Sequence, residues 1–189
     1  SHGGVGSYPG AACDVPSYTY LPFLDRTGFI PSKKYVNQSE IADYAEMLAD
    51  YCGIRENVRF SRKVTDMTYI QEGTWQISTF DMETDSEGET VYAKHVVSAN
   101  GPLSSPRMPE VPGMELFKGE SFHTASWNRK ASLAGKRVGV IGTGASAAQV
   151  ITSIADEVES LTVFQRTATW ALPRDDEPTP PEIVQAFEA

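Results

Sequence analysis

The sequence predicts an α/β fold, and three consecutive stretches near its C-terminal end carry this prediction. Residues 137–141 form a short apolar run, which is typical of a parallel strand buried on both faces. Residues 145–154 have apolar side chains at helical spacing, and residues 161–164 are again β-prone. Together they predict one strand–helix–strand unit of the Rossmann type.

The turn between the first strand and the helix has the sequence Gly142-Thr143-Gly144-Ala145-Ser146-Ala147, which is G-x-G-x-x-A. Gly142 permits a tight turn, Gly144 lets backbone approach a diphosphate, and Ala147 lets helix and strand pack closely. The helix N-terminus adds free N–H groups and the positive end of a dipole. We therefore predict a dinucleotide site whose cofactor-binding residues are 142–147 and Gln149.

The end of the second strand indicates which dinucleotide binds. An NAD site usually has an acid there, whereas this chain has Gln165-Arg166-Thr167. Arg166 can pair with a 2′-phosphate, and Thr167 can donate a hydroxyl hydrogen bond to it. These residues predict NADP(H) rather than NAD(H). The alternative is that Arg166 is a solvated surface arginine.

Composition limits the classes of function. The chain has 189 residues and a net charge of −9, which argues against a general binder of nucleic acid or anionic membranes. No apolar run is long enough to span a bilayer. The two cysteines, Cys13 and Cys52, have no metal-ligand spacing, so we expect no metal site and a reducing, cytoplasmic compartment.

The N-terminal half begins with a loop-like, aromatic segment that contains a single acid, Asp14. On the residues alone, Asp14 is interpreted as a turn aspartate. A helix is predicted from Ser39, as N-cap, to Gly53. Its apolar stripe comprises Ile41, Tyr44, Leu48, Tyr51 and Cys52, which predicts that Cys52 is buried.

Residues 57–98 change to a strand pattern and predict a β-meander. The expected strands are residues 58–60, 64–70, 74–80 and 90–97, with an acidic hairpin loop at 81–89. His95 falls on the last strand and is expected to be structural. A linker rich in Pro, Gly and Ser follows at 100–112, and the tail at 173–181 is expected to be a loop before a final helix.

Residues 117–128 carry a specific motif, F-x-G-x-x-x-H-x-x-x-W, formed by Phe117, Gly119, His123 and Trp127. This stretch resembles the fingerprint of the Baeyer–Villiger monooxygenases, the class B flavoprotein monooxygenases. The related flavin-containing N- and S-oxygenases usually have Tyr where this chain has Trp127. The family's next residue is Pro or Asp, and here it is Asn128.

Three other stretches agree with the resemblance. Residues 8–20 look like the family's segment after its first nucleotide motif, and residues 96–101, with Pro106 and Pro109, look like its link between two nucleotide domains. Residues 165–167 look like its NADP phosphate clamp. The family is a flavoprotein with two dinucleotide-binding domains. The implied divisions are a partial FAD-binding domain at 1–100, a linker at 101–135 and the start of an NADP-binding domain at 136–189.

The resemblance implies that NADPH reduces FAD and that one oxygen atom of O2 is inserted next to a ketone, giving an ester or lactone. Asp14 and Tyr20 would line the flavin side, with Cys13 and Asp14 near the nicotinamide, and Val64 would contact the adenine part of FAD. The expected catalytic residues are Asp14, His123 and Trp127.

His123 would couple domains more than carry a proton, and the alternative for both His123 and Trp127 is a packed anchor of the linker. The family's first G-x-G-x-x-G is not found, which favours an internal portion of a larger enzyme, with the remaining segments of that enzyme as its partners. Such a portion would bind FAD poorly and be inactive alone. Two alternatives stay open: a flavin-containing N- or S-oxygenase, and a non-catalytic NADP-binding module.

Overall fold

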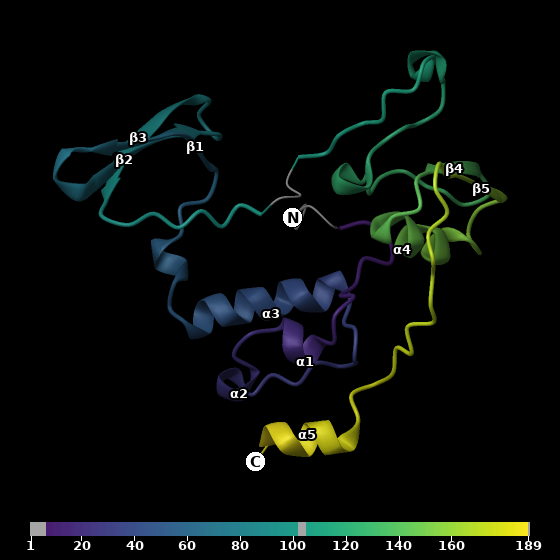
Figure 1. The fold of residues 1–189 in the computed structure, drawn as a ribbon, viewed down its shortest axis with the longest axis horizontal. Coiled ribbons are helices and arrows are strands. Elements are labelled where there is room, and N and C mark those ends of the chain that lie inside the picture. Colours follow the sequence, from purple (N-terminus) through teal and green to yellow (C-terminus); the bar gives the residue numbers. More distant parts are fainter. Residues whose placement is uncertain (1–6, 102–104, 189) are drawn as a thin grey trace. The chain divides into compact units, whose positions relative to one another are not determined.

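The computed structural model describes residues 7–101 and 105–188 and divides into two compact units (Figure 1). One unit comprises the described residues of Ser1–Tyr51 and Leu103–Ala189, and the other those of Cys52–Pro102. The domain boundaries expected at residues 100 and 135 stay a prediction. The α/β class is confirmed, and the described residues form two separate sheets, one of three strands and one of two.

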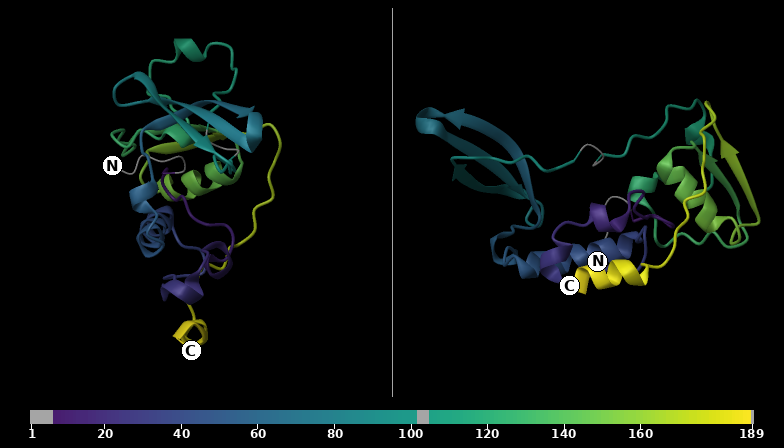
Figure 2. Two further views of the ribbon diagram at one scale, coloured as in Figure 1. Left: turned by 90° about the vertical axis from the view of Figure 1, so that its left-hand side faces the viewer. Right: turned by 60° about the horizontal axis from the view of Figure 1, so that its bottom comes forward.

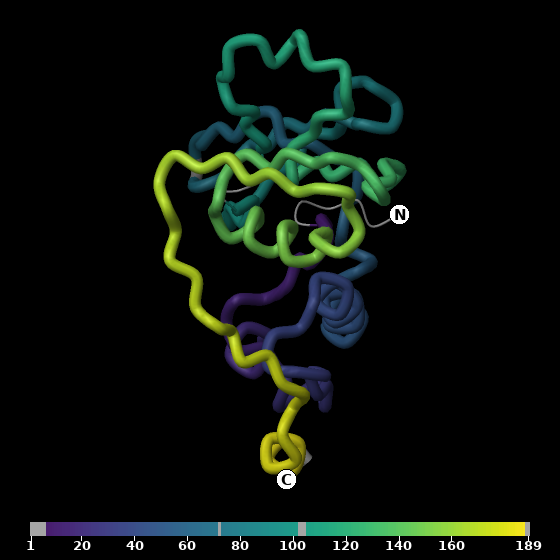
Figure 3. Tube along the Cα trace, turned by 90° about the vertical axis from the view of Figure 1, so that its right-hand side faces the viewer, coloured from purple at the N-terminus to yellow at the C-terminus, as the bar shows by residue number. Residues whose placement is uncertain are grey.

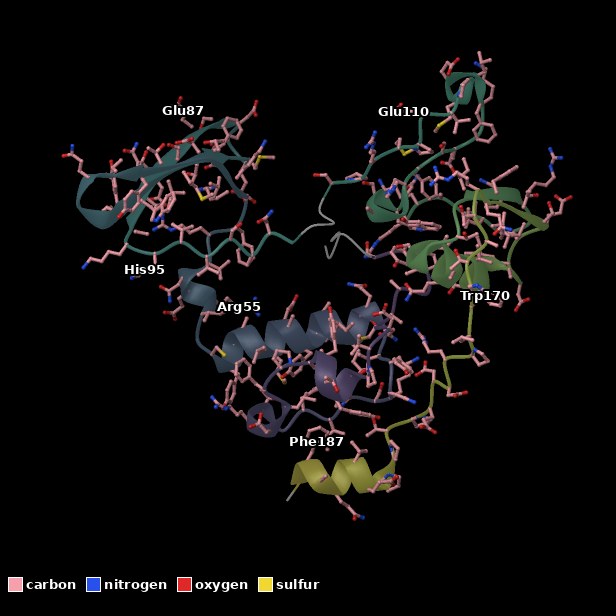
Figure 4. All side chains as sticks on the ribbon, viewed as in Figure 1. Arg55, Glu87, His95, Glu110, Trp170 and Phe187 are labelled. Atoms are coloured by element: carbon pink, nitrogen blue, oxygen red, sulfur yellow. The ribbon has the colours of Figure 1, made fainter. Side chains whose placement is uncertain are left out.

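The N-terminal segment forms three helices, α1 (Ser17–Tyr20), α2 (Leu24–Thr27) and α3 (Gln38–Tyr51), around a small core. The core consists of Leu21, Leu24, Val36 and Tyr44, with Phe29 and Phe187 packed against it. The Tyr44 hydroxyl donates a hydrogen bond to the Pro22 carbonyl, which satisfies the polar end of this buried ring. Figure 4 shows Phe187, on the C-terminal helix, directed toward this segment.

Two details of the predicted long helix are wrong. Its cap is Asn37 rather than Ser39, because the Asn37 Oδ1 accepts hydrogen bonds from the Glu40 N–H and the Ser39 hydroxyl. The helix also ends at Tyr51, so Cys52 lies in the following turn and is exposed. Tyr51 is exposed as well, and the buried stripe is therefore shorter than its sequence spacing indicates.

The second unit contains a three-stranded antiparallel meander, β1 (Arg62–Ile70), β2 (Thr74–Asp81) and β3 (Ser86–Ala93), in the order β1-β2-β3. Its register places Met67, Ile77 and Val91 across from one another, while Thr68, Gln76 and Tyr92 share the opposite face. One face is thus apolar, with Tyr69 and Trp75 in edge-to-face contact at 5.3 Å between ring centroids.

The meander is confirmed, but its outer limits differ from the prediction. Residues 58–60 form no strand, and the third strand begins at Ser86 and ends at Ala93. The expected loop at 81–89 is therefore mostly strand. His95 follows β3 rather than lying on it, and Figure 4 shows it on the extended segment.

The two-stranded sheet is the predicted strand–helix–strand unit, with β4 (Arg137–Ile141), α4 (Ala145–Ile154) and β5 (Ser160–Phe164). The strands pair in parallel from Arg137 opposite Ser160 to Ile141 opposite Phe164, and α4 lies against one side of the pair (Figure 2). Among the described residues β4 is not buried on both faces, because Val138 and Val140 are half-buried while their neighbours are exposed.

Short 3-10 turns and a final helix complete the described chain. The bounds are η1 (Arg55–Asn57), η2 (Gln71–Gly73), η3 (Met114–Leu116), η4 (Thr124–Ser126) and α5 (Pro181–Glu188). The expected loop-then-helix tail is confirmed, and Figure 3 follows it from β5 to α5. None of the described helices has the length and apolar character that a membrane crossing requires.

Candidate NADP(H) site and fingerprint region

The turn between β4 and α4 has the backbone geometry that its glycines predict. Gly142 has φ +113°, a conformation that side chains with a Cβ rarely adopt, and its N–H donates to the Phe164 carbonyl at 2.8 Å. Gly144 has an extended backbone, with φ −72° and ψ 179°, and occupies the N-cap of α4. The two glycines are therefore needed for different reasons.

The space in front of Gly144 is open. Within the described part of the chain, a Cβ added there would meet no atom within 4 Å, and no side chain caps the helix. The first main-chain hydrogen bond of the helix runs from the Ala148 N–H to the Gly144 carbonyl, at 3.0 Å. The amides of Ala145, Ser146 and Ala147 precede it and have no acceptor within the helix. Free amides, the positive end of the helix dipole and a vacant approach are what a diphosphate requires.

The end of β5 lies beside this turn. The Thr143 hydroxyl is 3.4 Å from the Thr167 carbonyl, to which it donates, and 3.1 Å from the Thr169 hydroxyl. Arg166 lies in the segment after β5, directly before Thr167. It is exposed, and it makes no ion pair or hydrogen bond with another described residue. The guanidinium is thus available to an anion. The free helix amides and the positive charge of Arg166 are compatible with an NADP(H) molecule, and the residues that bind it stay a prediction.

Gln149 and Ala147 have structural contacts on α4. Ala147 is buried, as the close packing of helix on strand requires. Both ends of the Gln149 amide are engaged with the N-terminal segment: its Oε1 accepts from the Tyr8 hydroxyl at 2.9 Å, and its Nε2 donates to the Ala12 carbonyl at 3.0 Å. The expected cofactor contact of Gln149 stays a prediction.

Cys13 and Asp14 have opposite environments. Cys13 is buried, and its Sγ donates to the Val15 carbonyl at 2.8 Å. Burial raises the pKa of the Cys13 thiol above its ordinary value of 9.0, and the neighbouring Asp14 charge adds to the rise, so the thiol stays protonated at neutral pH. Asp14 itself is exposed, as is Tyr20. Their expected places on the flavin side stay predictions.

Val64 lies in the other unit, on β1, where it pairs with Thr79 just before a β-bulge. The residue is 51% exposed within its own unit. Its predicted contact with the adenine part of FAD is not tested by the fold of its own unit.

The fingerprint residues have clear packing roles. A Cβ on Gly119 would lie 2.6 Å from the tip of the Phe117 ring, which is 65% exposed and would have to turn aside. The His123 Nδ1 accepts a hydrogen bond from the Ala125 N–H at 3.0 Å and caps η4. Trp127 packs edge-to-face on Phe122, with ring centroids 4.9 Å apart. These contacts are those of a packed anchor, and the catalytic roles of His123 and Trp127 stay predictions.

Asn128, where this chain departs from the fingerprint, also acts locally. Its Oδ1 accepts a hydrogen bond from the Lys130 N–H at 3.1 Å, and its carbonyl accepts one from the Ala131 N–H. An aspartate makes the same side-chain bond, which explains why Asn is acceptable at this position. Trp127, Asn128 and Lys130 also border an open hollow of about 420 Å³ together with Ser7.

Sequence reasoning missed one cluster, formed by Arg174 and Asp176 with Lys33 and Tyr35. The Lys33 Nζ lies 2.6 Å from Asp176 Oδ2, and the Tyr35 N–H donates to Asp176 Oδ1 at 3.2 Å. The partners are separated by more than a hundred residues, so no local pattern could have indicated them. No group of three or more His, Cys, Asp or Glu side chains in the described chain is placed to hold a metal ion.

Comparison with protein families decides the relationship. The flavin-binding monooxygenase-like family matches residues 14–186, which include the segment at Asp14, the fingerprint and the glycine turn. The chain belongs to the flavin-binding monooxygenase-like family. Its predicted resemblance to the Baeyer–Villiger monooxygenases is confirmed by similar curated proteins.

One such relative is a Baeyer–Villiger monooxygenase of Streptomyces coelicolor, which is 42% identical over 174 residues, covering 90% of this chain and 31% of the relative. Another is 2-oxo-Δ3-4,5,5-trimethylcyclopentenylacetyl-CoA monooxygenase of Pseudomonas putida, which is 39% identical, covering 95% of this chain and 34% of the relative. The chain therefore spans about a third of the length of these family members.

Solved structures of the family agree with the fold. Cyclohexanone monooxygenase from Rhodococcus sp. Phi1, bound to NADP+, superimposes with a TM-score of 0.84 and 40% identity over 97% of this chain and 34% of that one. OTEMO, in complex with FAD and NADP, also has a TM-score of 0.84, with 34% identity over 98% of this chain and 35% of that one. The predicted Rossmann-type flavoprotein fold is confirmed, and the chain contains a part of it.

Proposed function

We propose that this chain supplies the NADP(H)-binding turn and part of the flavin-side surface of a Baeyer–Villiger monooxygenase. The enzyme uses FAD, NADPH and O2, and converts a ketone into an ester or lactone. The observation that carries this proposal is the open N-terminus of α4 together with Arg166, which has no partner among residues 7–101 and 105–188. It has the charge and the free amides that a 2′-phosphorylated dinucleotide needs.

The residues of this chain have separate tasks in the proposal. The amides of residues 145–147 bind the diphosphate, and Arg166 with Thr167 binds the 2′-phosphate. The fingerprint at residues 117–127 holds the segment before the nucleotide unit in place through the packed rings of Phe122 and Trp127. Bound NADPH supplies the hydride and bound FAD supplies the oxygen chemistry. Asp14 and Tyr20 contribute exposed side chains to the flavin side.

We also propose a cytoplasmic location for the enzyme, with the remaining segments of the parent enzyme as its partners. Both cysteines are free thiols, which favours a reducing compartment. The Baeyer–Villiger assignment is favoured over a flavin-containing N- or S-oxygenase because Trp127 matches the former fingerprint. Screening the flavin-loaded enzyme against ketones, amines and sulfides distinguishes the two: oxygenation confined to amines and sulfides would contradict the proposal.

The cofactor part of the proposal is tested by fluorescence titration of NADPH and NADH. We expect Arg166→Ala to weaken NADPH binding at least about tenfold, since one charge-assisted hydrogen bond contributes about 1.5–3 kcal/mol. NADH affinity should not change. The matched control is Arg107→Ala, because the Arg107 side chain is 88% exposed and, among the residues that the structure describes, pairs only with Glu110 on its own loop. Equal NADPH affinity in wild type and Arg166→Ala would contradict the assignment.

A further inference from the structure

Two consecutive carbonyls just before Asp14 are held by side chains from far along the chain. The Ala12 carbonyl accepts from Gln149 Nε2 at 3.0 Å, and the Cys13 carbonyl accepts from Arg174 Nη1 at 3.1 Å. Gln149 belongs to α4, and Arg174 belongs to the tail that follows β5. The loop that carries Asp14 is therefore tied at two points to the nucleotide-binding part of its unit.

Arg174 makes three contacts at once. Besides the bond to the Cys13 carbonyl, its guanidinium lies over the Tyr35 ring at 5.1 Å from the centroid, and its Nη2 is 3.6 Å from Asp176 Oδ2. The planar guanidinium of arginine has five N–H donors and can contact these partners together, whereas the compact ammonium group of lysine cannot reach all of them at once. Arginine therefore suits this position better than lysine.

The tail has its own attachments, which do not depend on the bond to Cys13. Asp176 pairs with Lys33, and two main-chain hydrogen bonds join the segments: Lys34 N–H to the Glu177 carbonyl at 2.9 Å, and Thr179 N–H to the Ser32 carbonyl at 3.1 Å. Figure 3 shows the tail descending from β5 toward these N-terminal residues. Docking of the tail and restraint of the Cys13 carbonyl are therefore separable.

We propose that Arg174 is a positioning residue, whose hydrogen bond to the Cys13 carbonyl holds the Asp14 loop at a set place relative to α4 and its glycine turn. This proposal rests on the proposed function, in which that loop lies on the flavin side and the turn binds NADP(H). Hydride transfer requires the two cofactors to meet within a narrow distance. Arg174 acts through the main chain of Cys13 and not on either cofactor.

The first test is amide hydrogen exchange, which needs no cofactor. The Cys13 N–H donates to the Val36 carbonyl at 2.9 Å and reports on the loop, while the Lys34 and Thr179 amides report on tail docking. In Arg174→Lys we expect the Cys13 amide to exchange at least tenfold faster, with the Lys34 and Thr179 amides unchanged, because a lysine keeps the charge for Asp176. In Arg174→Ala the Cys13 amide should exchange at least as fast, and Arg107→Ala should match wild type.

Two results would overturn the proposal. Unchanged exchange at Cys13 in both Arg174 variants would show that the loop does not depend on this bond. Equal acceleration at Cys13, Lys34 and Thr179 in Arg174→Lys would show that the arginine only docks the tail. If Arg174→Ala fails to fold, the lysine variant decides.

The second test measures flavin reduction by NADPH in the FAD-loaded holoenzyme under anaerobic stopped-flow conditions. The limiting rate should fall at least tenfold in Arg174→Lys while the NADPH dissociation constant stays within twofold, a split that simple loss of the fold does not produce. A limiting rate equal to wild type would contradict the positioning role. If the wild-type holoenzyme is not reduced by NADPH, the proposed function fails, and hydrogen exchange still decides the role of Arg174.

Discussion

Alanine should have different consequences at the two glycines of the turn: Gly142→Ala should destabilise the fold, and Gly144→Ala should weaken NADPH binding. At Gly142 the backbone has φ +113°, so an alanine is strained whatever the surrounding space. We expect a loss of about 1–3 kcal/mol in the free energy of unfolding. At Gly144 φ is −72° and an added Cβ meets no described atom within 4 Å, so the free energy of unfolding should stay within about 1 kcal/mol of wild type.

Although Gly144→Ala should leave the free energy of unfolding almost unchanged, it should weaken NADPH binding strongly. A Cβ projects about 1.5 Å from the Cα. This displacement takes a diphosphate oxygen out of hydrogen-bond range of the helix amides, since such bonds span about 2.7–3.2 Å. Losing two charge-assisted bonds of about 1.5 kcal/mol each corresponds to a weakening of about a hundredfold. Urea unfolding and NADPH fluorescence titration measure the two quantities. Gly144→Ala with wild-type NADPH affinity would refute the reasoning.

Three further predictions concern the rest of the chain. Gly10→Ala should destabilise the fold by at least about 2 kcal/mol in urea unfolding, because φ is +75° and the new Cβ would lie 2.0 Å from Ser153 Oγ; a loss below about 0.5 kcal/mol would contradict this. Burial opposes ionisation of Asp176, but its hydrogen bond and ion pair with Lys33 and its contacts with nearby groups outweigh burial and lower its pKa. The stabilisation by the Asp176 carboxylate is therefore present above about pH 3.8 and is lost as pH falls through the lower folded-state pKa. The free energies of unfolding of wild type and Asp176→Asn should differ at pH 7 and converge at acid pH, and a difference that stays constant with pH would contradict this. His123→Asn should keep the side-chain hydrogen bond that caps η4, whereas His123→Ala should lose it and about 1 kcal/mol of the free energy of unfolding. In thermal unfolding, the alanine variant should therefore melt at a lower temperature than the asparagine variant.

The strand–helix–strand unit could be predicted closely because its signals are local. Apolar runs bounded by glycines placed β4 and α4 with the bounds that the structure has. The fingerprint residues could be found in the sequence because they resemble a known family motif, whereas their individual contacts could not be predicted from it.

The rest could not be predicted because it depends on contacts between distant residues. The apolar stripe of α3 continues in the sequence through Cys52, whereas the helix ends one residue earlier, at Tyr51. The stripe alone therefore could not show where the helix ends. The bond from Arg174 to the Cys13 carbonyl joins residues 161 positions apart. Likewise, the position of Gln149 on a helix gave no sign that its side-chain amide forms hydrogen bonds with the Tyr8 hydroxyl and the Ala12 carbonyl.

The central claim is that a 2′-phosphorylated dinucleotide binds at the N-terminus of α4 beside Arg166. Titration of the 15N-labelled protein with NADP+, followed by NMR, tests it most directly. The account predicts that the largest amide shifts fall on residues 144–147 and 166–167, and that NAD+ leaves 166–167 unmoved. Shifts confined to other parts of the chain, or identical responses to the two dinucleotides, would contradict it.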